Sequence, residues 1–143
     1  TDGEEGEWLW GNNNAISADM VSATFRKMAD EGRFRKLLCF VETCYSGSIA
    51  KKCEGIPGLL LFTAANDKET SKADSFNNDL GVWMTNRFTS VLLEKTGLNP
   101  NISLRELYLD MFHQTLGSHV SVYNSECYGN IYRNTMSEFL LPL

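Results

Sequence analysis

The chain has 143 residues, of which 43% are hydrophobic and 22% are charged, a composition typical of a folded globular protein. A chain of this length buries roughly 70% of the surface of its unfolded form, so its stability requires neither metal nor disulfides. Its 13 basic and 18 acidic residues give a net charge of −5, which argues against nucleic acid and anionic membrane surfaces as partners. We expect residues 1–143 to form a single domain.

The cysteines and histidines do not have the spacing of a metal site. No Cys-x-x-Cys pair is present, and only two histidines accompany the four cysteines. We therefore expect no metal and no cofactor.

No apolar run approaches the ~20 residues that a membrane-spanning helix needs.

The first half of the chain predicts a strand, a helix and a second strand. Residues Glu7–Trp10 form a short apolar strand, and Ser17 caps a helix that ends near Gly32. Leu37–Val41 is a continuous apolar run, which is typical of a central parallel strand that is covered on both faces. The helix is expected to bury one face, formed by Met20, Val21, Thr24, Phe25 and Met28.

The second half continues this alternation. Leu59–Thr63 is another apolar strand, and residues 66–79 read as a long polar loop, which is either functional or mobile. A helix is expected from about residue 80 to 95, and Ser103 caps a further helix. Residues 120–123 are expected to form a last strand. The order of elements predicts an α/β sandwich with a mainly parallel sheet flanked by helices.

Cys44 lies just beyond the strand Leu37–Val41, where α/β folds usually place their functional site. Small polar residues that can begin a helix follow it, and backbone N–H groups at such a turn can stabilise a thiolate or an oxyanion. Cys39, by contrast, lies in the middle of the strand between apolar neighbours and is expected to be a packing residue. Cys44 is therefore the candidate nucleophile.

Several segments together resemble the legumain family of cysteine peptidases. Residues 40–48, Phe-Val-Glu-Thr-Cys-Tyr-Ser-Gly-Ser, are similar to the nucleophile block of that family, in which a hydrophobic strand leads into Glu-Ala-Cys-Glu-Ser-Gly-Ser. Thr-Ala-Ala-Asn at 63–66, Glu-Thr-Ser at 69–71 and Gly-Ser-His-Val at 117–120 resemble further family blocks. Other segments, among them Arg-Phe-Thr at 87–89, look closer to a sister branch, the catalytic subunit of the glycosylphosphatidylinositol transamidase.

The resemblance implies a caspase-like three-layer α/β fold, of which this chain is the C-terminal part, with N-terminal strands missing. It also implies a Cys-His dyad, in which an imidazole deprotonates the thiol and later protonates the leaving amine. Backbone N–H groups of Cys44 and Gly3 would form the oxyanion hole.

The catalytic histidine is absent where the family pattern requires it. Family members often carry Thr-Asp-His-Gly there, whereas this chain begins Thr-Asp-Gly. Three explanations remain: a histidine missing from this sequence, which we favour, an inactive relative, or a histidine supplied by a preceding segment. His119 is the obvious substitute, but family correspondence makes it structural, and His113 on the next helix is expected to be a bystander.

Substrate binding is expected to involve Glu42, Ser71 and Thr70. In legumains the primary pocket combines acidic and basic groups to hold an Asn side chain, and Glu42 matches one of its acids. The alternative for Glu42 is a surface salt bridge with Lys51 or Lys52. Ser71, or Thr70 beside it, matches the hydroxyl region of that pocket. Val82 stands where the family pattern has a second acid, so a preference for small residues is the alternative to Asn.

The resemblance leaves three functions open: a legumain-type endopeptidase acting through a thioester on Cys44, a transamidase subunit, or an inactive peptide-binding relative. The expected partners are a peptide or protein substrate and a pro-segment or upstream chain, with membrane subunits only for a transamidase. The implied compartment is the secretory pathway, lysosome or vacuole, or the endoplasmic reticulum for a transamidase.

Overall fold

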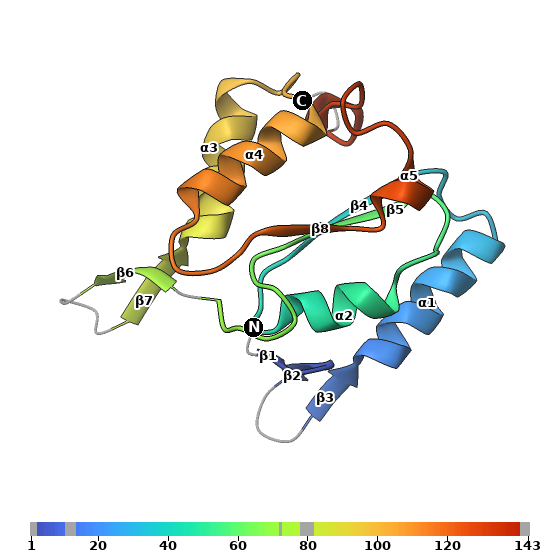
Figure 1. Ribbon diagram of the computed structural model, residues 1–143, viewed down its shortest axis with the longest axis horizontal. Coiled ribbons are helices and arrows are strands. Elements are labelled where there is room, and N and C mark those ends of the chain that lie inside the picture. The colour runs from blue at the N-terminus through green and yellow to red at the C-terminus, as the bar shows by residue number, and fades with distance from the viewer. Residues whose placement is uncertain (1–2, 11–13, 72, 78–81, 141–143) are drawn as a thin grey trace.

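The computed structural model describes residues 3–10, 14–71, 73–77 and 82–140. A central sheet lies between two pairs of helices (Figure 1). The sheet contains β4 (Leu37–Val41), β5 (Leu59–Thr63) and β8 (Ser121–Tyr123), in the order β4-β5-β8. The helices α1 (Ala18–Asp30) and α2 (Ser46–Lys52) cover one face, and α3 (Arg87–Leu98) and α4 (Leu104–Gln114) cover the other. The α/β sandwich expected from the sequence is confirmed, and its layers agree with a caspase-like fold.

The expectation of a mainly parallel sheet is wrong for the described residues. β4 and β5 are parallel, with Leu37 beside Leu59, but β8 runs antiparallel to β5. β4 was also expected to be a central strand, whereas in the described part of the chain it pairs only with β5. Most of its side chains are consequently only half-buried.

β5 is the central strand of the sheet, and its side chains enter the hydrophobic cores on both faces. Leu60 and Phe62 point into the core beneath α3 and α4, while Leu59 and Leu61 point into the core against α1 and α2. All its residues are buried. Because successive side chains alternate between two covered faces, four of the five residues are apolar, and the fifth, Thr63, places its hydroxyl 3.5 Å from the carbonyl oxygen of Ser121.

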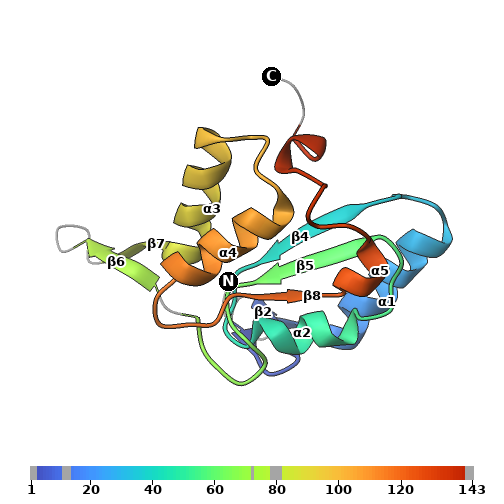
Figure 2. The same ribbon diagram turned by 45° about the horizontal axis from the view of Figure 1, so that its top comes forward.

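Two small antiparallel sheets extend from this core (Figure 2). At the N-terminus, β1 (Gly3–Glu4), β2 (Glu7–Trp10) and β3 (Asn14–Ser17) form one of them. The predicted strand Glu7–Trp10 is confirmed as β2. The other is the pair β6 (Ala73–Asn77) and β7 (Val82–Asn86).

The β6–β7 pair corrects two predictions. Residues 66–79 were expected to form a loop, but β6 begins at Ala73, and the helix expected from about residue 80 begins only at Arg87. The sequence Val-Trp-Met-Thr of β7 is rich in β-branched and aromatic residues, which favour a strand over a helix. Asn86 then has the extended backbone of a helix N-cap.

Local capping signals were predicted correctly. The Ser17 side chain accepts a hydrogen bond from the backbone N–H of Met20, and Ser103 and Glu106 form a capping box at the start of α4.

The expected buried face of α1 is wrong in part, because Met20 is 58% exposed, whereas Ala18 and Val21 are buried. The short elements α5 (Ser125–Tyr128) and η1 (Met136–Glu138) complete the chain. Among the described residues, no helix has the length and hydropathy to cross a membrane.

Candidate active site

Cys44 lies at a sharp turn between β4 and α2. Tyr45, the next residue, has φ +54° and ψ +24°, a left-handed conformation that is uncommon for a residue other than glycine. Its backbone N–H donates to the carbonyl oxygen of Glu69 over 2.8 Å. The turn leaves Cys44 half-buried at the carboxyl end of the sheet, as predicted.

The sulfur of Cys44 faces Ser71. The Sγ atom lies 3.7 Å from the carbonyl oxygen of Ser71 and 3.9 Å from its hydroxyl oxygen. The predicted site residues Cys44 and Ser71 are therefore adjacent in space, although 27 residues separate them in sequence. Thr70 has an exposed side chain.

Gly3 also lies against Cys44. A Cβ atom at this position would be 2.5 Å from the carbonyl oxygen of Cys44 and 3.0 Å from Cβ of Thr43. Such a close approach of two backbones requires a residue without a side chain. Ser48 strengthens this connection, since its hydroxyl accepts from the N–H of Gly6 over 2.7 Å and donates to the carbonyl oxygen of Tyr45 over 2.6 Å.

The start of α2 is fixed to the loop after β5. The Ser46 hydroxyl accepts from the N–H of Ala65 over 3.1 Å, and the N–H of Gly47 donates to the carbonyl oxygen of Ala65 over 3.1 Å. A Cβ atom on Gly47 would be 2.7 Å from the backbone of both Asn66 and Asp67. The loops at the ends of β4 and β5 are thus in direct backbone contact.

Glu42 lies beside Cys44 in sequence but lines a separate space. It accepts a hydrogen bond from the hydroxyl of Thr89 on α3. The alternative of a salt bridge with Lys51 or Lys52 is wrong, because these lysines pair with Asp67 and Asp19. A cavity of about 560 Å³ opens beside Glu42, and its lining is otherwise mostly apolar: Trp8, Leu9, Ile16, Phe40, Val41 and Thr43.

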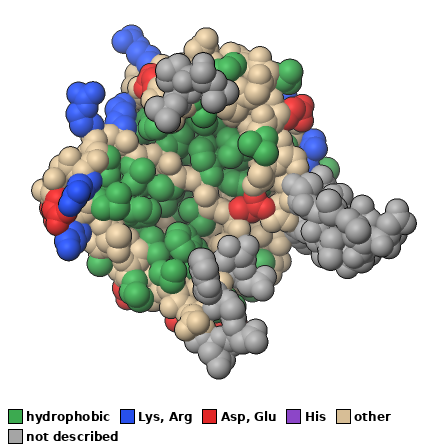
Figure 3. All heavy atoms as spheres, turned by 180° about the vertical axis from the view of Figure 1, so that it is seen from behind, with side chains coloured by type: hydrophobic (Ala, Val, Ile, Leu, Met, Phe, Trp, Pro, Cys, Tyr) green, Lys and Arg blue, Asp and Glu red, His purple; other side chains and the backbone are tan. Residues whose placement is uncertain are grey.

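Apolar side chains also form a broad patch on the face turned away in Figure 1 (Figure 3).

Neither histidine of the described chain contacts Cys44. The Nδ1 atom of His119 lies 2.8 Å from a carboxylate oxygen of Glu69, and the ring of His113 packs edge-on against Phe112. Thr1 and Asp2, where the family histidine was sought, are outside the described residues, as is Gly81, and the side chain of Val82 is not described either. In the described residues no group of His, Cys, Asp and Glu side chains is arranged to hold a metal ion.

Cys39 and Cys53 are neutral thiols held in the core. Burial raises the pKa of Cys39 to about 11, which keeps its thiol protonated at neutral pH, as expected for a packing residue. Burial, together with the nearby Cys39, also raises the pKa of Cys53 to about 11. Thiolate chemistry is thereby disfavoured at both positions.

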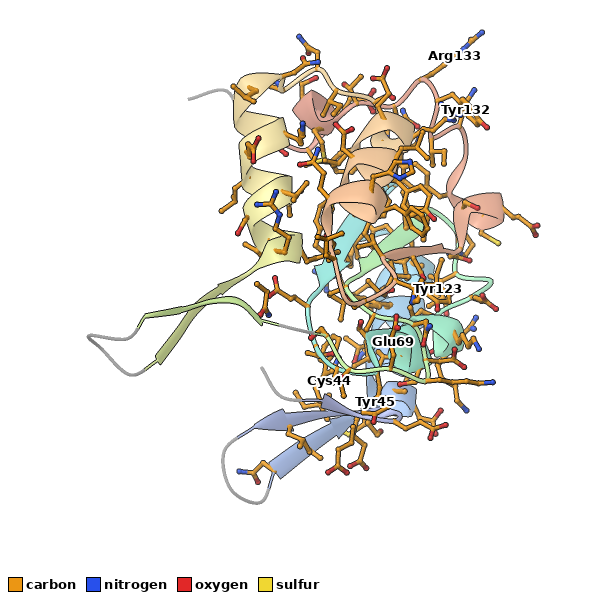
Figure 4. All side chains as sticks on the ribbon, turned by 60° about the vertical axis from the view of Figure 1, so that its left-hand side comes forward. Cys44, Tyr45, Glu69, Tyr123, Tyr132 and Arg133 are labelled. Atoms are coloured by element: carbon orange, nitrogen blue, oxygen red, sulfur yellow. The ribbon has the colours of Figure 1, made fainter. Side chains whose placement is uncertain are left out.

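Glu69, Tyr45 and Thr89 belong to the site although no role for them was predicted from the sequence. Glu69 belongs to the matched block Glu-Thr-Ser, which was the one available signal, but its partners become visible only in the folded chain. Figure 4 shows Cys44, Tyr45 and Glu69 gathered at one end of the molecule, whereas Tyr132 and Arg133 lie at the other.

Comparison with known protein families gives one match over most of the chain. The model of the peptidase C13 family matches residues 2–138, nearly the whole chain. A search of curated proteins gave no match.

Proposed function

Because the chain belongs to the peptidase C13 family, we propose that it is a cysteine endopeptidase of legumain type, which cleaves peptide bonds through a thioester on Cys44. The observation that carries this proposal is the position of Cys44 itself. Its sulfur is half-buried at the carboxyl end of the sheet, beside Ser71, and its backbone touches Gly3. Cys39, which lies earlier in the same strand-and-turn segment, is held as a neutral thiol in β4.

In the proposed reaction an imidazole accepts the proton of the Cys44 thiol, and the thiolate attacks the carbonyl carbon of the substrate. Backbone N–H groups of Cys44 and Gly3 stabilise the oxyanion of the tetrahedral intermediate. The C–N bond then breaks, and the imidazolium protonates the leaving amine. Water next adds to the thioester, giving up a proton to the imidazole, and the C–S bond breaks to release the acid and restore the thiol.

No imidazole contacts Cys44 among the described residues, and we propose that the base is a histidine directly before Gly3, where the family pattern has it. The close contact between the backbones of Gly3 and Cys44 supports this position. Glu42 and the cavity beside it are proposed to receive a substrate side chain, with Ser71 and Thr70 near the other side of the nucleophile. We further propose a secretory, lysosomal or vacuolar location.

A labelling experiment tests the nucleophile. The chain is treated with a peptide chloromethyl ketone, and the modified cysteine is identified by mass spectrometry in wild type, Cys44→Ser and Cys127→Ser. Labelling that disappears only in Cys44→Ser supports the proposal. Absence of labelling at Cys44 in the folded wild-type chain contradicts it.

An insertion tests the base. A variant with His inserted between Asp2 and Gly3 is expected to hydrolyse peptides at least about 100-fold faster than the parent chain, since general base catalysis contributes on this scale. Peptides that vary only in the residue before the scissile bond then decide between Asn and small residues. Hydroxamates formed with added hydroxylamine would report the thioester in either enzyme, whereas efficient release of acid products without any added amine distinguishes the endopeptidase from a transamidase.

The inactive peptide-binding relative is a second candidate, and the absence of an imidazole beside Cys44 in the described chain favours it. Calorimetry separates it from the enzyme. A scaffold binds the test peptides with the same affinity in wild type and Cys44→Ser, and neither wild type nor the His insertion cleaves them.

A further inference from the structure

Glu69 connects chain segments that meet at the candidate active site. One oxygen of its carboxylate accepts from the backbone N–H of Asn66 over 2.9 Å and from that of His119 over 2.7 Å. The other oxygen lies 2.8 Å from Nδ1 of His119. A single side chain therefore ties the loop after β5 to the segment that enters β8, 50 residues further along the chain.

The main chain of Glu69 reaches the nucleophile as well. Its carbonyl oxygen accepts from the N–H of Tyr45, the residue with the left-handed backbone directly after Cys44. The same loop carries Ser71, whose carbonyl and hydroxyl oxygens face the sulfur of Cys44. The segment from Glu69 to Ser71 therefore contacts both the backbone of Tyr45 and the sulfur of Cys44.

The contacts of Glu69 depend on its charge. Burial raises the pKa of this carboxyl group, but hydrogen bonds from Asn66 and His119 outweigh that effect and leave the pKa below its usual value. Glu69 is thus an anion at neutral pH, and hydrogen bonds to an anion are stronger than those between neutral groups. The neighbouring carboxylate of Asp67 pairs with Lys51 and does not compete for His119.

We propose that Glu69 is a positioning residue, which holds Ser71 over the sulfur of Cys44 and fixes the turn at Tyr45 through its bonds to Asn66 and His119. The inference rests on the proposed function only in treating Cys44 as the nucleophile. It assigns His119 a task other than that of catalytic base: to anchor the carboxylate of Glu69.

The cysteines of the chain provide the assay. Iodoacetamide modification is followed by mass spectrometry at Cys44, at exposed Cys127 as the reference, and at fully buried Cys53 as a reporter of unfolding. In Glu69→Ala the loop is released, so the rate at Cys44 relative to Cys127 is expected to rise at least fivefold, while Cys53 stays protected. Labelling of Cys44 by the peptide chloromethyl ketone is expected to fall about tenfold, because a misplaced site reacts poorly with an oriented ligand.

Two further variants make the result decisive. Glu94→Gln removes an exposed carboxylate on α3 and is expected to behave as wild type. Glu69→Gln retains the shape of the side chain without its charge, and its rates at Cys44 are expected between those of wild type and Glu69→Ala. If Cys53 becomes reactive in Glu69→Ala, Glu69→Gln alone decides the question.

Rates at Cys44 in the folded Glu69 variants that equal those of wild type overturn the positioning role. A wild-type chain that reacts with iodoacetamide but not with the peptide reagent contradicts the proposed function instead. In that case the iodoacetamide rates still test whether Glu69 holds Ser71 over the sulfur.

Discussion

The backbone of Gly3 is in contact with the backbone of Cys44, although β1 and the turn after β4 are far apart in sequence: a Cβ atom on Gly3 would lie 2.5 Å from the carbonyl oxygen of Cys44. This contact places the N-terminal sheet against Cys44, the proposed nucleophile. It also makes Gly3 a position at which a small added side chain would disturb the geometry of the site.

Gly3→Ala is expected to displace β1 or the Cys44 turn, because the added methyl group has no free space. Overpacking of this kind costs about 1–3 kcal/mol of unfolding free energy, measured by urea denaturation. Labelling of Cys44 by the peptide chloromethyl ketone should decrease as well. Gly97→Ala is the control, since nothing lies within 4 Å of a Cβ atom there. If Gly3→Ala has the stability and the Cys44 labelling of wild type, the contact between Gly3 and Cys44 is unimportant.

Gly47→Ala is expected to separate α2 from the loop after β5. The new methyl group would meet the hydroxyl of Tyr123 and the backbone of Asn66 and Asp67, the latter two at 2.7 Å. We expect a loss of about 1–3 kcal/mol in urea denaturation, and faster modification of Cys53, which follows α2 directly. An unchanged Cys53 rate in a destabilised protein would place the damage elsewhere.

Three of the four cysteines, Cys127, Cys39 and Cys53, are expected to react in a defined order. At pH 8 a thiol with a pKa of about 11, as at Cys39 and Cys53, is ionised to about one part in a thousand. Exposed Cys127 should therefore be modified first by iodoacetamide, and Cys39 and Cys53 only slowly until urea unfolds the chain. Time-resolved mass spectrometry of the cysteine peptides checks this order, and early modification of Cys53 would refute it.

The contribution of Glu69 to stability is expected to depend on pH. Its pKa in the folded chain is below the usual 4.5, so the fold favours the ionised form. The resulting stabilisation is present above the pKa of the unfolded chain and is lost as the pH falls through the lower pKa of the folded chain. The melting temperature of Glu69→Gln should therefore be lower than that of wild type at pH 7, with a difference that disappears in acid. A difference that is constant from pH 7 to strongly acidic conditions would contradict the assignment.

The sequence by itself determined the elements whose cause is local. The apolar run Leu59–Thr63 forms a strand that is buried on both faces of the sheet, and the run Leu37–Val41 forms the half-buried strand beside it. Ser17 and Ser103 begin helices because their hydroxyls satisfy free N–H groups one turn later. The position of Cys44 beyond a buried strand followed from the same reasoning. The Val-Trp-Met-Thr run of β7 was misjudged, because its apolar spacing suits a helix while its residue types favour a strand.

Only the tertiary structure decided which side chains share the site. Ser71 faces Cys44, Thr89 binds Glu42 and Glu69 binds His119 across separations of 27, 47 and 50 residues. No local pattern encodes these pairs, because hydrogen bonds between distant segments form where packing of the helices and the sheet brings the segments together. The sequence thus indicated Cys44 as the candidate nucleophile, while the packing of the layers selected the residues that contact it.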